Sequence, residues 1–285
     1  MAGHRAATGR PGSTSGGLTH LTVVDHAALR DLALDIARAV GPEIGRRAGR
    51  VDVSSTKSTA SDLVTEVDRW SEDQIVSRIL DARPGDSILG EEGTGVEGTS
   101  NIRWVVDPID GTTDFVYGHP GFSISIGVEV DNEPVAGVVL DPLLDDEFAA
   151  AVGYGTTRNG QPVRVSGTTD LAAALVATGF SYDPDRRGRQ AEVLVGLLPQ
   201  IRDIRRMGGA ATDLASVSCG RVDAYFERGL NPWDCAAGTV LVSEAGGRVT
   251  DLDGRPSTGE MMVAAPAAIH GPLLDLLQTV GADRV

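Results

Sequence analysis

Four acidic residues have the type and position of metal ligands. They are Glu91, Asp107, Asp110 and Asp234. Each follows an apolar run or precedes a helical pattern, so the carboxylates can point into one shared cleft. Asp107 and Asp110 flank a proline and can converge on one ion through a tight turn, which exposes the Ile109 carbonyl as a further ligand. Hard oxygen donors of this kind suit Mg²⁺. No histidine is placed as a ligand, which argues against zinc or iron.

The stretch from Asp107 to Thr113 also admits a purely structural interpretation. Asp110 could cap a helix, and Asp107 could simply end a strand. In the functional interpretation, Gly111-Thr112-Thr113 opens a helix whose free N–H groups bind phosphate oxygens. The glycine allows close approach, and a threonine hydroxyl can orient a water. Small residues also lead into a predicted helix at 208–211, which is weaker evidence for a second phosphate-binding helix start.

The overall charge excludes several classes of partner. Lys and Arg total 25 and Asp and Glu total 40, which gives a net charge of −15 over 285 residues. Such a chain is a poor binder of nucleic acid or of an anionic membrane. A phosphate substrate would need cations to mask the acidic charge. Lys57 is the one lysine, which suggests a role that a planar guanidinium cannot fill.

Length and patterning set the broad class. The chain is long enough for about two domains, and its 41% hydrophobic content is typical of a globular protein. We find no membrane span and no secretory signal, so we expect a cytoplasmic protein. Residues 1–20 are rich in Gly, Ser and Thr and are predicted to be a disordered extension. With only Cys219 and Cys235, a disulfide scaffold is not expected.

The first half of the chain predicts helices followed by an antiparallel sheet. Helical spacing covers 25–49, with Asp25 as N-cap and a kink or an interruption at Gly41-Pro42. A polar loop over 51–62 leads to a second helix over 64–82. Strands are predicted at 87–92, 103–107, 122–130, 133–141 and 147–152, and the second of these breaks at Pro108. We expect the two helices to flank this sheet.

The second half alternates strands and helices. Strands are predicted at 174–179, 203–206, 223–227 and 261–265, and helices at 189–199, 210–220 and 234–245. This alternation indicates an α/β layer.

Three motifs in this order resemble the inositol monophosphatase family of Mg²⁺-dependent, lithium-sensitive phosphatases. They are Gly90-Glu91-Glu92, Trp104 to Thr113, and Trp233 to Gly238. The resemblance covers Val23 to the C-terminus and implies a layered α-β-α-β-α sandwich. We expect an α+β half over 21–165 with the main metal site and an α/β half over 166–285 that completes it.

The resemblance implies a role for each site residue. Two or three Mg²⁺ ions would be held by Glu91, Asp107, the Ile109 carbonyl, Asp110 and Asp234, whereas Glu92 is not expected to be a ligand. Asp68 would pair with Thr112 to activate the attacking water, together with Glu91. Lys57, in a mobile loop, would be a further catalytic residue. Attack is expected without a phospho-enzyme. The residues expected to contact substrate are Glu91, Ile109, Asp110, Gly111, Thr112, Thr113, Ala210, Glu227 and Asp234.

The implied reaction is hydrolysis of inositol 1-phosphate, a small phosphorylated polyol, by a homodimer. Glu227 would accept a hydrogen bond from a sugar hydroxyl, although a surface pair with Arg228 is the alternative. Asp114 replaces the asparagine of many relatives and adds acid near the site, and His119 lies in a loop that differs from some of them. Histidinol-phosphate, fructose-1,6-bisphosphate or nucleotide 3′-phosphate stay open as substrates. A non-catalytic regulatory protein with the same fold is a further alternative.

Overall fold

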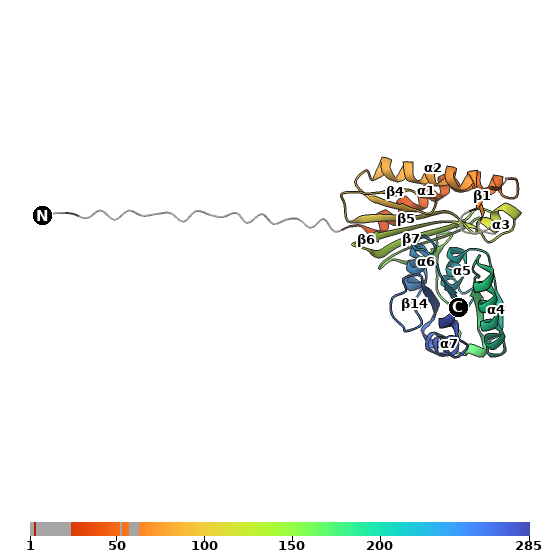
Figure 1. Cartoon of the computed structure of the whole chain (residues 1–285). Helices are drawn as coiled ribbons and strands as arrows, with labels where there is room; N and C mark the ends of the chain where they lie inside the picture. The colour runs from red at the N-terminus through yellow and green to blue at the C-terminus, as the bar shows by residue number, and fades with distance from the viewer. Residues whose placement is uncertain (1–2, 4–23, 52, 57–62) are drawn as a thin grey trace.

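The structure is a computed structural model, and it describes residue 3 and residues 24–51, 53–56 and 63–285. Most of the predicted N-terminal extension, and Lys57, lie outside these residues. Five layers make up the described part (Figure 1). Helices α1 and α2 form the first layer, an eight-stranded sheet the second, helices α5 and α6 the third, a five-stranded sheet the fourth, and helices α4 and α7 the fifth. The α-β-α-β-α sandwich is therefore confirmed.

The first layer contains two long amphipathic helices, α1 (His26–Arg47) and α2 (Glu66–Ala82). The predicted N-cap of α1 is confirmed, because the Asp25 carboxylate accepts hydrogen bonds from the amides of Ala27 and Ala28. A short hairpin, β1 (Val53–Thr56) and β2 (Leu63–Thr65), occupies part of the predicted loop and leads directly into α2.

Of the two outcomes predicted for Gly41-Pro42, an interruption is wrong, because α1 continues through Pro42 to Arg47. An internal proline costs about 3 kcal/mol or more, and burial of the apolar face of α1 offsets this cost. Gly41 lets the helix approach the sheet closely, since a Cβ at this position would lie 2.8 Å from a methyl carbon of Leu140.

The large sheet has the strand order β10-β9-β8-β7-β6-β5-β3-β4. Its strands are β3 (Ser87–Gly90), β4 (Gly95–Val96), β5 (Ile102–Asp110), β6 (Ser123–Val130), β7 (Glu133–Asp141), β8 (Asp146–Ala151), β9 (Gly155–Arg158) and β10 (Gln161–Val163). Neighbours pair antiparallel as predicted, except that β3 runs parallel to β5. The parallel pair places the C-terminal end of β3 beside the middle of β5, which matters for the site.

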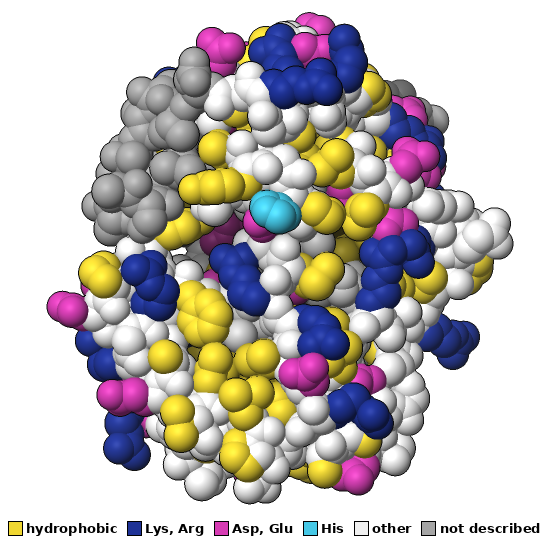
Figure 2. Space-filling model, turned by 90° about the vertical axis from the view of Figure 1, so that its right-hand side faces the viewer, with side chains coloured by type: hydrophobic (Ala, Val, Ile, Leu, Met, Phe, Trp, Pro, Cys, Tyr) yellow, Lys and Arg dark blue, Asp and Glu magenta, His cyan; other side chains and the backbone are white. Residues whose placement is uncertain are grey.

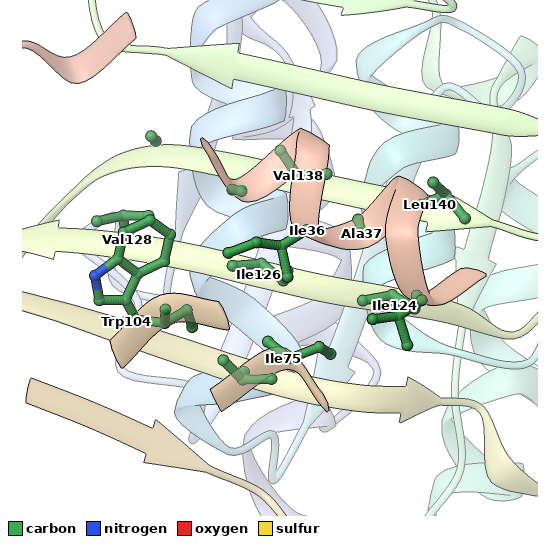
Figure 3. Packing of buried hydrophobic residues seen from close by; sticks show 14 of the residues in the cluster. Ile36, Ala37, Ile75, Trp104, Ile124, Ile126, Val128, Val138 and Leu140 are labelled. Carbon is green, nitrogen blue, oxygen red and sulfur yellow. The ribbon is translucent and has the colours of Figure 1, made fainter. Parts of the chain in front are cut away.

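The main core lies between the first helical layer and the large sheet (Figure 3). Ile36 of α1 and Ile75 of α2 contribute from the helices, and Trp104, Ile124 and Ile126 contribute from the strands. All five are buried. At about 25 cal/mol per Å² of apolar area removed from water, this core fixes the helices on one face and leaves the other face for α5 and α6.

The second sheet has the order β12-β11-β13-β15-β14. Its strands are β11 (Leu175–Thr178), β12 (Asp203–Arg205), β13 (Ala224–Arg228), β14 (Gly247–Thr250) and β15 (Met261–Pro266). The helices around it are α4 (Pro184–Leu197), α5 (Ala210–Ser218), α6 (Pro232–Glu244) and α7 (Ala267–Thr279). Parallel pairing of β11 with β12 and β13 agrees with the expected α/β layer, whereas α7 and β14 are not predicted from the sequence.

Among the described helices, none combines the length and the apolar character that a membrane span requires.

Candidate active site

The first two candidate ligands lie at the end of β5. The predicted break at Pro108 is wrong, because the strand continues to Asp110 with a register irregularity after Asp107. Proline cannot donate to the ladder, so a bulge forms here and Asp110 then pairs with Ser123 of β6. The Asp107 carboxylate accepts a hydrogen bond from the Ile109 amide over 3.0 Å. The bulge brings both aspartates to the side of the sheet that faces α5 and α6.

The third ligand, Asp234, lies in the first turn of α6. Its carboxylate accepts a hydrogen bond from the Asn231 amide over 2.6 Å, within a capping box. Asp110 caps α5 in turn, because the amides of Ala210 and Ala211 donate to its two oxygens over 3.2 and 2.8 Å. One ligand atom from each of Asp107, Asp110 and Asp234 lies within 4.8 Å of the others.

This three-aspartate cluster is electrostatically costly without a cation. Burial raises the pKa of Asp110 to about 7, and the charges of Glu91 and Glu227 contribute to the increase. Burial also raises the pKa of Asp107 and of Asp234, and the neighbouring acids raise both further. A divalent cation bound by these carboxylate oxygens would relieve the repulsion between them. The donor set therefore fits the predicted Mg²⁺, and the capping hydrogen bonds of Asp110 leave further lone pairs for coordination.

Glu91 lines the same cleft and lies within hydrogen-bond reach of the Asp107 carboxylate. Its charge is one of the causes that raise the pKa values of all three aspartates. Glu72 of α2, which was not predicted from the sequence, stabilises the turn after β3 in which Glu91 lies. The buried Glu72 carboxylate accepts hydrogen bonds from the amides of Glu92 and Thr94 over 2.8 and 3.0 Å. Gly90 makes room for it, because a Cβ there would lie 2.5 Å from a Glu72 oxygen.

Asp68 and Thr112 lie side by side, as the resemblance implied. The Thr112 hydroxyl lies 3.2 Å from Oδ1 of Asp68 and 3.1 Å from the Ile109 carbonyl oxygen. Asp68 is fully buried, and the Thr65 amide donates to its other oxygen over 2.8 Å. Burial raises the pKa of Asp68, while the hydrogen bonds from Thr65 and Thr112 oppose the increase. Thr112 follows Gly111, whose φ of 86° lies in the region that favours glycine.

Glu227 lies on β13, on the face of the second sheet that packs against α5 and α6. The fully buried Tyr225 hydroxyl donates to Oε2 of Glu227 over 2.7 Å. Gly179, just after β11, leaves the space that the carboxylate fills. The alternative pair with Arg228 does not form, because Arg228 donates to Glu260 and to the Asp283 carbonyl instead. Burial raises the pKa of Glu227, although Tyr225 and nearby arginines lower it.

One cleft of about 390 Å³ brings most of these groups together. The buried Asp68 does not line it and borders it only through its hydrogen bond with Thr112. Acidic side chains lie in a hollow on the face that Figure 2 shows, and basic side chains lie beside it. The predicted residues that line the cleft are Glu91, Asp107, Ile109, Asp110, Gly111, Thr112, Ala210, Glu227 and Asp234. Thr113 is half-buried and does not line it. The Ala210 amide is already bonded to Asp110.

Comparisons with known proteins give the chain its family. The profile of the inositol monophosphatase family matches residues 19–281. The chain belongs to the inositol monophosphatase family. The Mycobacterium tuberculosis inositol-1-monophosphatase SuhB is 41% identical over 272 residues, which cover 88% of this chain and 94% of that protein. The Pseudomonas aeruginosa Nus factor SuhB is 43% identical over 231 residues, 79% of this chain and 85% of that one.

A solved structure agrees with the family assignment. The extragenic suppressor protein SuhB from Bartonella henselae superposes with a TM-score of 0.83 at 35% identity, over 88% of this chain and 98% of that one. The inositol monophosphatase family is phosphatase-type, generally metal-dependent, and acts on small phosphorylated substrates. The acidic cluster described above could hold such a metal.

Asp114, which was expected to add acid near the site, lies in the short helix α3 (Thr112–Tyr117). Its side chain packs against the backbone of Gly208, where a Cβ would lie 1.7 Å from Oδ2 of Asp114. Burial raises the pKa of Asp114, and the charges of Arg206 and His119 oppose this. The residue lies behind the cleft wall and does not line the cleft.

Proposed function

We propose that the protein is a Mg²⁺-dependent phosphomonoesterase that hydrolyses inositol 1-phosphate to inositol and phosphate. The observation that supports this most directly is that the three-aspartate cluster and Glu227 line one cleft. The cluster offers a site for the phosphate end of a substrate, and Glu227 offers an acceptor for hydroxyls of the leaving group. The 41% identity to an inositol-1-monophosphatase adds support.

The metal would be held by Asp107, Asp110, Asp234, Glu91 and the Ile109 carbonyl. When bound, Mg²⁺ supplies an activated water and offsets the negative charge of the phosphate and of the leaving oxygen. The four carboxylates place negative charge in a partly water-excluded cleft, so a bound cation would neutralise them and leave little net charge to repel a phosphate dianion.

The residues around Thr112 would prepare the nucleophile. Asp68 accepts from the Thr112 hydroxyl, which leaves the oxygen lone pairs of Thr112 free to accept a hydrogen bond from a neighbouring water and so to orient it. That orientation fixes the direction of attack, and proximity of this kind contributes several kcal/mol to catalysis. The amides of Gly111 and Thr112 border the same part of the cleft and would donate to phosphate oxygens.

Glu227 would recognise the polyol. A carboxylate that already accepts one hydrogen bond from Tyr225 still has lone pairs for a substrate hydroxyl. Such a charge-assisted bond is worth roughly 1.5–3 kcal/mol. We further propose, in line with the family resemblance, that Li⁺ inhibits the protein, that it is a homodimer and that it is cytoplasmic. The net charge of −15 disfavours nucleic acid and anionic membranes as partners.

Two kinds of alternative follow from the comparisons. Other phosphatases that share the metal site would differ in the leaving-group pocket, and histidinol-phosphate, fructose-1,6-bisphosphate and nucleotide 3′-phosphate are the candidate substrates. A non-catalytic role is the other alternative, since one relative is named a Nus factor. The complete set of acidic ligands favours an enzyme.

The test is phosphate release from a panel of these esters with Mg²⁺, using the wild type and Glu227→Gln. The wild type should hydrolyse inositol 1-phosphate and lose activity in EDTA. In Glu227→Gln, kcat/KM for inositol 1-phosphate relative to p-nitrophenyl phosphate should fall by roughly ten- to a hundredfold. Absence of hydrolysis on the whole panel would contradict an enzymatic role. If Glu227→Gln leaves the ratio of the two kcat/KM values unchanged, Glu227 does not recognise the polyol.

A further inference from the structure

One face of α2 changes from polar to apolar along the helix. Asp68, Ser71 and Glu72 lie on this face in the first two turns, and Ile75 and Ile79 continue the same stripe. All five side chains are buried. The two isoleucines pack in the main core, whereas a buried carboxylate or hydroxyl is costly unless it makes hydrogen bonds. The polar part of the stripe therefore depends on its partners.

These partners belong to three different segments around the cleft. Asp68 accepts a hydrogen bond from the Thr112 hydroxyl. The Ser71 hydroxyl donates to the Pro108 carbonyl over 3.3 Å, within the bulge of β5. Glu72 accepts hydrogen bonds from the turn after β3. One stripe of α2 thus contacts every segment of the first half of the chain that carries a candidate metal ligand.

Glu72 contacts the backbone on both sides of Glu91. Its carboxylate lies against Gly90, where a Cβ would be 2.5 Å from Oε2. The same carboxylate accepts from the amides of Glu92 and Thr94 over 2.8 and 3.0 Å. Glu72 does not line the cleft, so it can influence a bound cation only through the turn that it holds.

The turn after β3 has few other supports. The Glu91 amide donates to the Val106 carbonyl over 3.1 Å and fixes the start of the turn. Beyond it, Gly93 is exposed, with a φ of 109° and no atom within 4 Å of its Cβ position. The strand that follows, Gly95–Val96, is two residues long and lies at the edge of the sheet. So short an edge strand stabilises a turn weakly, which leaves Glu72 as its main anchor.

We propose that Glu72 is a positioning residue that sets the affinity of the cleft for Mg²⁺ by holding Glu91 in place to bind the ion. This rests on the proposed function, in which Glu91 is a metal ligand. A ligand that is already fixed loses less conformational freedom when the ion binds. Partners that orient a ligand in this way are typically worth roughly ten- to a hundredfold in metal affinity.

The test is calorimetric titration of Mg²⁺ into the wild type and two variants. Glu72→Gln has nearly the same size but presents an NH₂ group to one of the two backbone amides. Glu72→Asp keeps the charge but is too short to reach both amides. Each variant should raise the Kd for Mg²⁺ roughly tenfold or more. The matched control is Asp73→Asn, which removes a charge from the exposed side of the same helix and should leave the Kd within about twofold.

Two further measurements separate positioning from stability and from charge. The Mg²⁺ concentration that gives half-maximal hydrolysis of p-nitrophenyl phosphate should rise by the same factor as the Kd. Melting temperatures in EDTA report the stability of each variant without metal. A lower melting temperature with an unchanged Kd overturns the proposal, because Glu72 then only supports the fold. An increase in Kd for Glu72→Gln alone also overturns it, because the charge of Glu72 and not its contacts would then matter. Failure of both variants to fold overturns it as well, since Glu72 would then be required by the fold as a whole.

Failure of the proposed function has a different result, because the titration does not need turnover. If the variants bind Mg²⁺ more weakly than the wild type but no ester is hydrolysed, the phosphatase activity is wrong and the role of Glu72 is supported. If the wild type hydrolyses esters with Mg²⁺ and the Kd is the same in all variants, only the role of Glu72 is wrong. A wild type that binds no Mg²⁺ overturns both.

Discussion

The hydroxyl of Tyr225 donates to Oε2 of Glu227 over 2.7 Å, and the two residues are two positions apart on β13. Alternate residues of a strand share one face, so the pair forms a single unit on the side of the second sheet that faces the cleft. Tyr225 is fully buried and its ring is fixed by the surrounding core. The carboxylate is therefore held in one orientation.

Tyr225→Phe removes that hydrogen bond with little change in volume. We expect the free energy of unfolding to change by about 1 kcal/mol. KM for inositol 1-phosphate should rise about threefold to tenfold relative to KM for p-nitrophenyl phosphate, because Glu227 loses its fixed orientation. Steady-state kinetics with both esters checks this. A rise that is equal for the two would indicate a general folding defect instead.

Gly179→Ala should displace the Glu227 carboxylate, since the added Cβ would lie 1.9 Å from Oε2. We expect kcat/KM for inositol 1-phosphate relative to p-nitrophenyl phosphate to fall about tenfold, because small misplacements of a positioning group are costly. Gly188→Ala in α4 is the matched control, as no atom lies within 4 Å of its Cβ position. This control should stabilise the protein by up to about 1 kcal/mol and leave the ratio of the two esters unchanged.

Mg²⁺ should raise the melting temperature by about 5–10 °C at saturating concentration, because it relieves repulsion within the three-aspartate cluster. Asp107→Asn should reduce this shift and lower kcat on the order of a hundredfold. Calorimetry with Mg²⁺, with EDTA, and with NaCl at equal ionic strength measures the shift. If Asp107→Asn keeps the full Mg²⁺-dependent rise in melting temperature and normal turnover, Asp107 is not a metal ligand.

Asp86 should stabilise the fold in a pH-dependent way. Burial opposes its ionisation, but hydrogen bonds from Arg83, Trp104 and Ser100 outweigh burial and lower the pKa of Asp86 below its usual value. Because the folded pKa lies below the unfolded pKa of about 3.9, the stabilisation is complete above about pH 5 and is lost as the pH falls through the unfolded and then the folded pKa.

Asp86→Asn should therefore lower the free energy of unfolding at pH 7 by about 1–3 kcal/mol, and by less near pH 3. Urea unfolding at both pH values measures the difference. The exposed Asp73→Asn in α2 is the control, with an expected change below about 0.5 kcal/mol. A loss that does not depend on pH would show that the Asp86 charge contributes nothing.

The three-aspartate cluster could be predicted from sequence because its members lie in short motifs whose local turns bring Asp107 and Asp110 together. Tyr225 and Glu72 could not, because their contacts depend on how separate elements pack. Glu72 reaches the turn after β3 only once α2 has packed on the large sheet. The continuous helix through Pro42 has the same cause, since packing on Leu140 overrides a local preference.

Asp110 ends a strand of the large sheet and caps α5, a helix that packs against the small sheet. One carboxylate therefore connects the two sheets, and it would also be a ligand of the proposed metal. Neither half of the chain alone carries a full coordination sphere, because Asp107 and Asp110 come from one half and Asp234 from the other. If the halves were expressed as two separate polypeptides, metal-dependent turnover would appear only on their reassociation. The catalytic centre is in this sense a reporter of the completed tertiary structure.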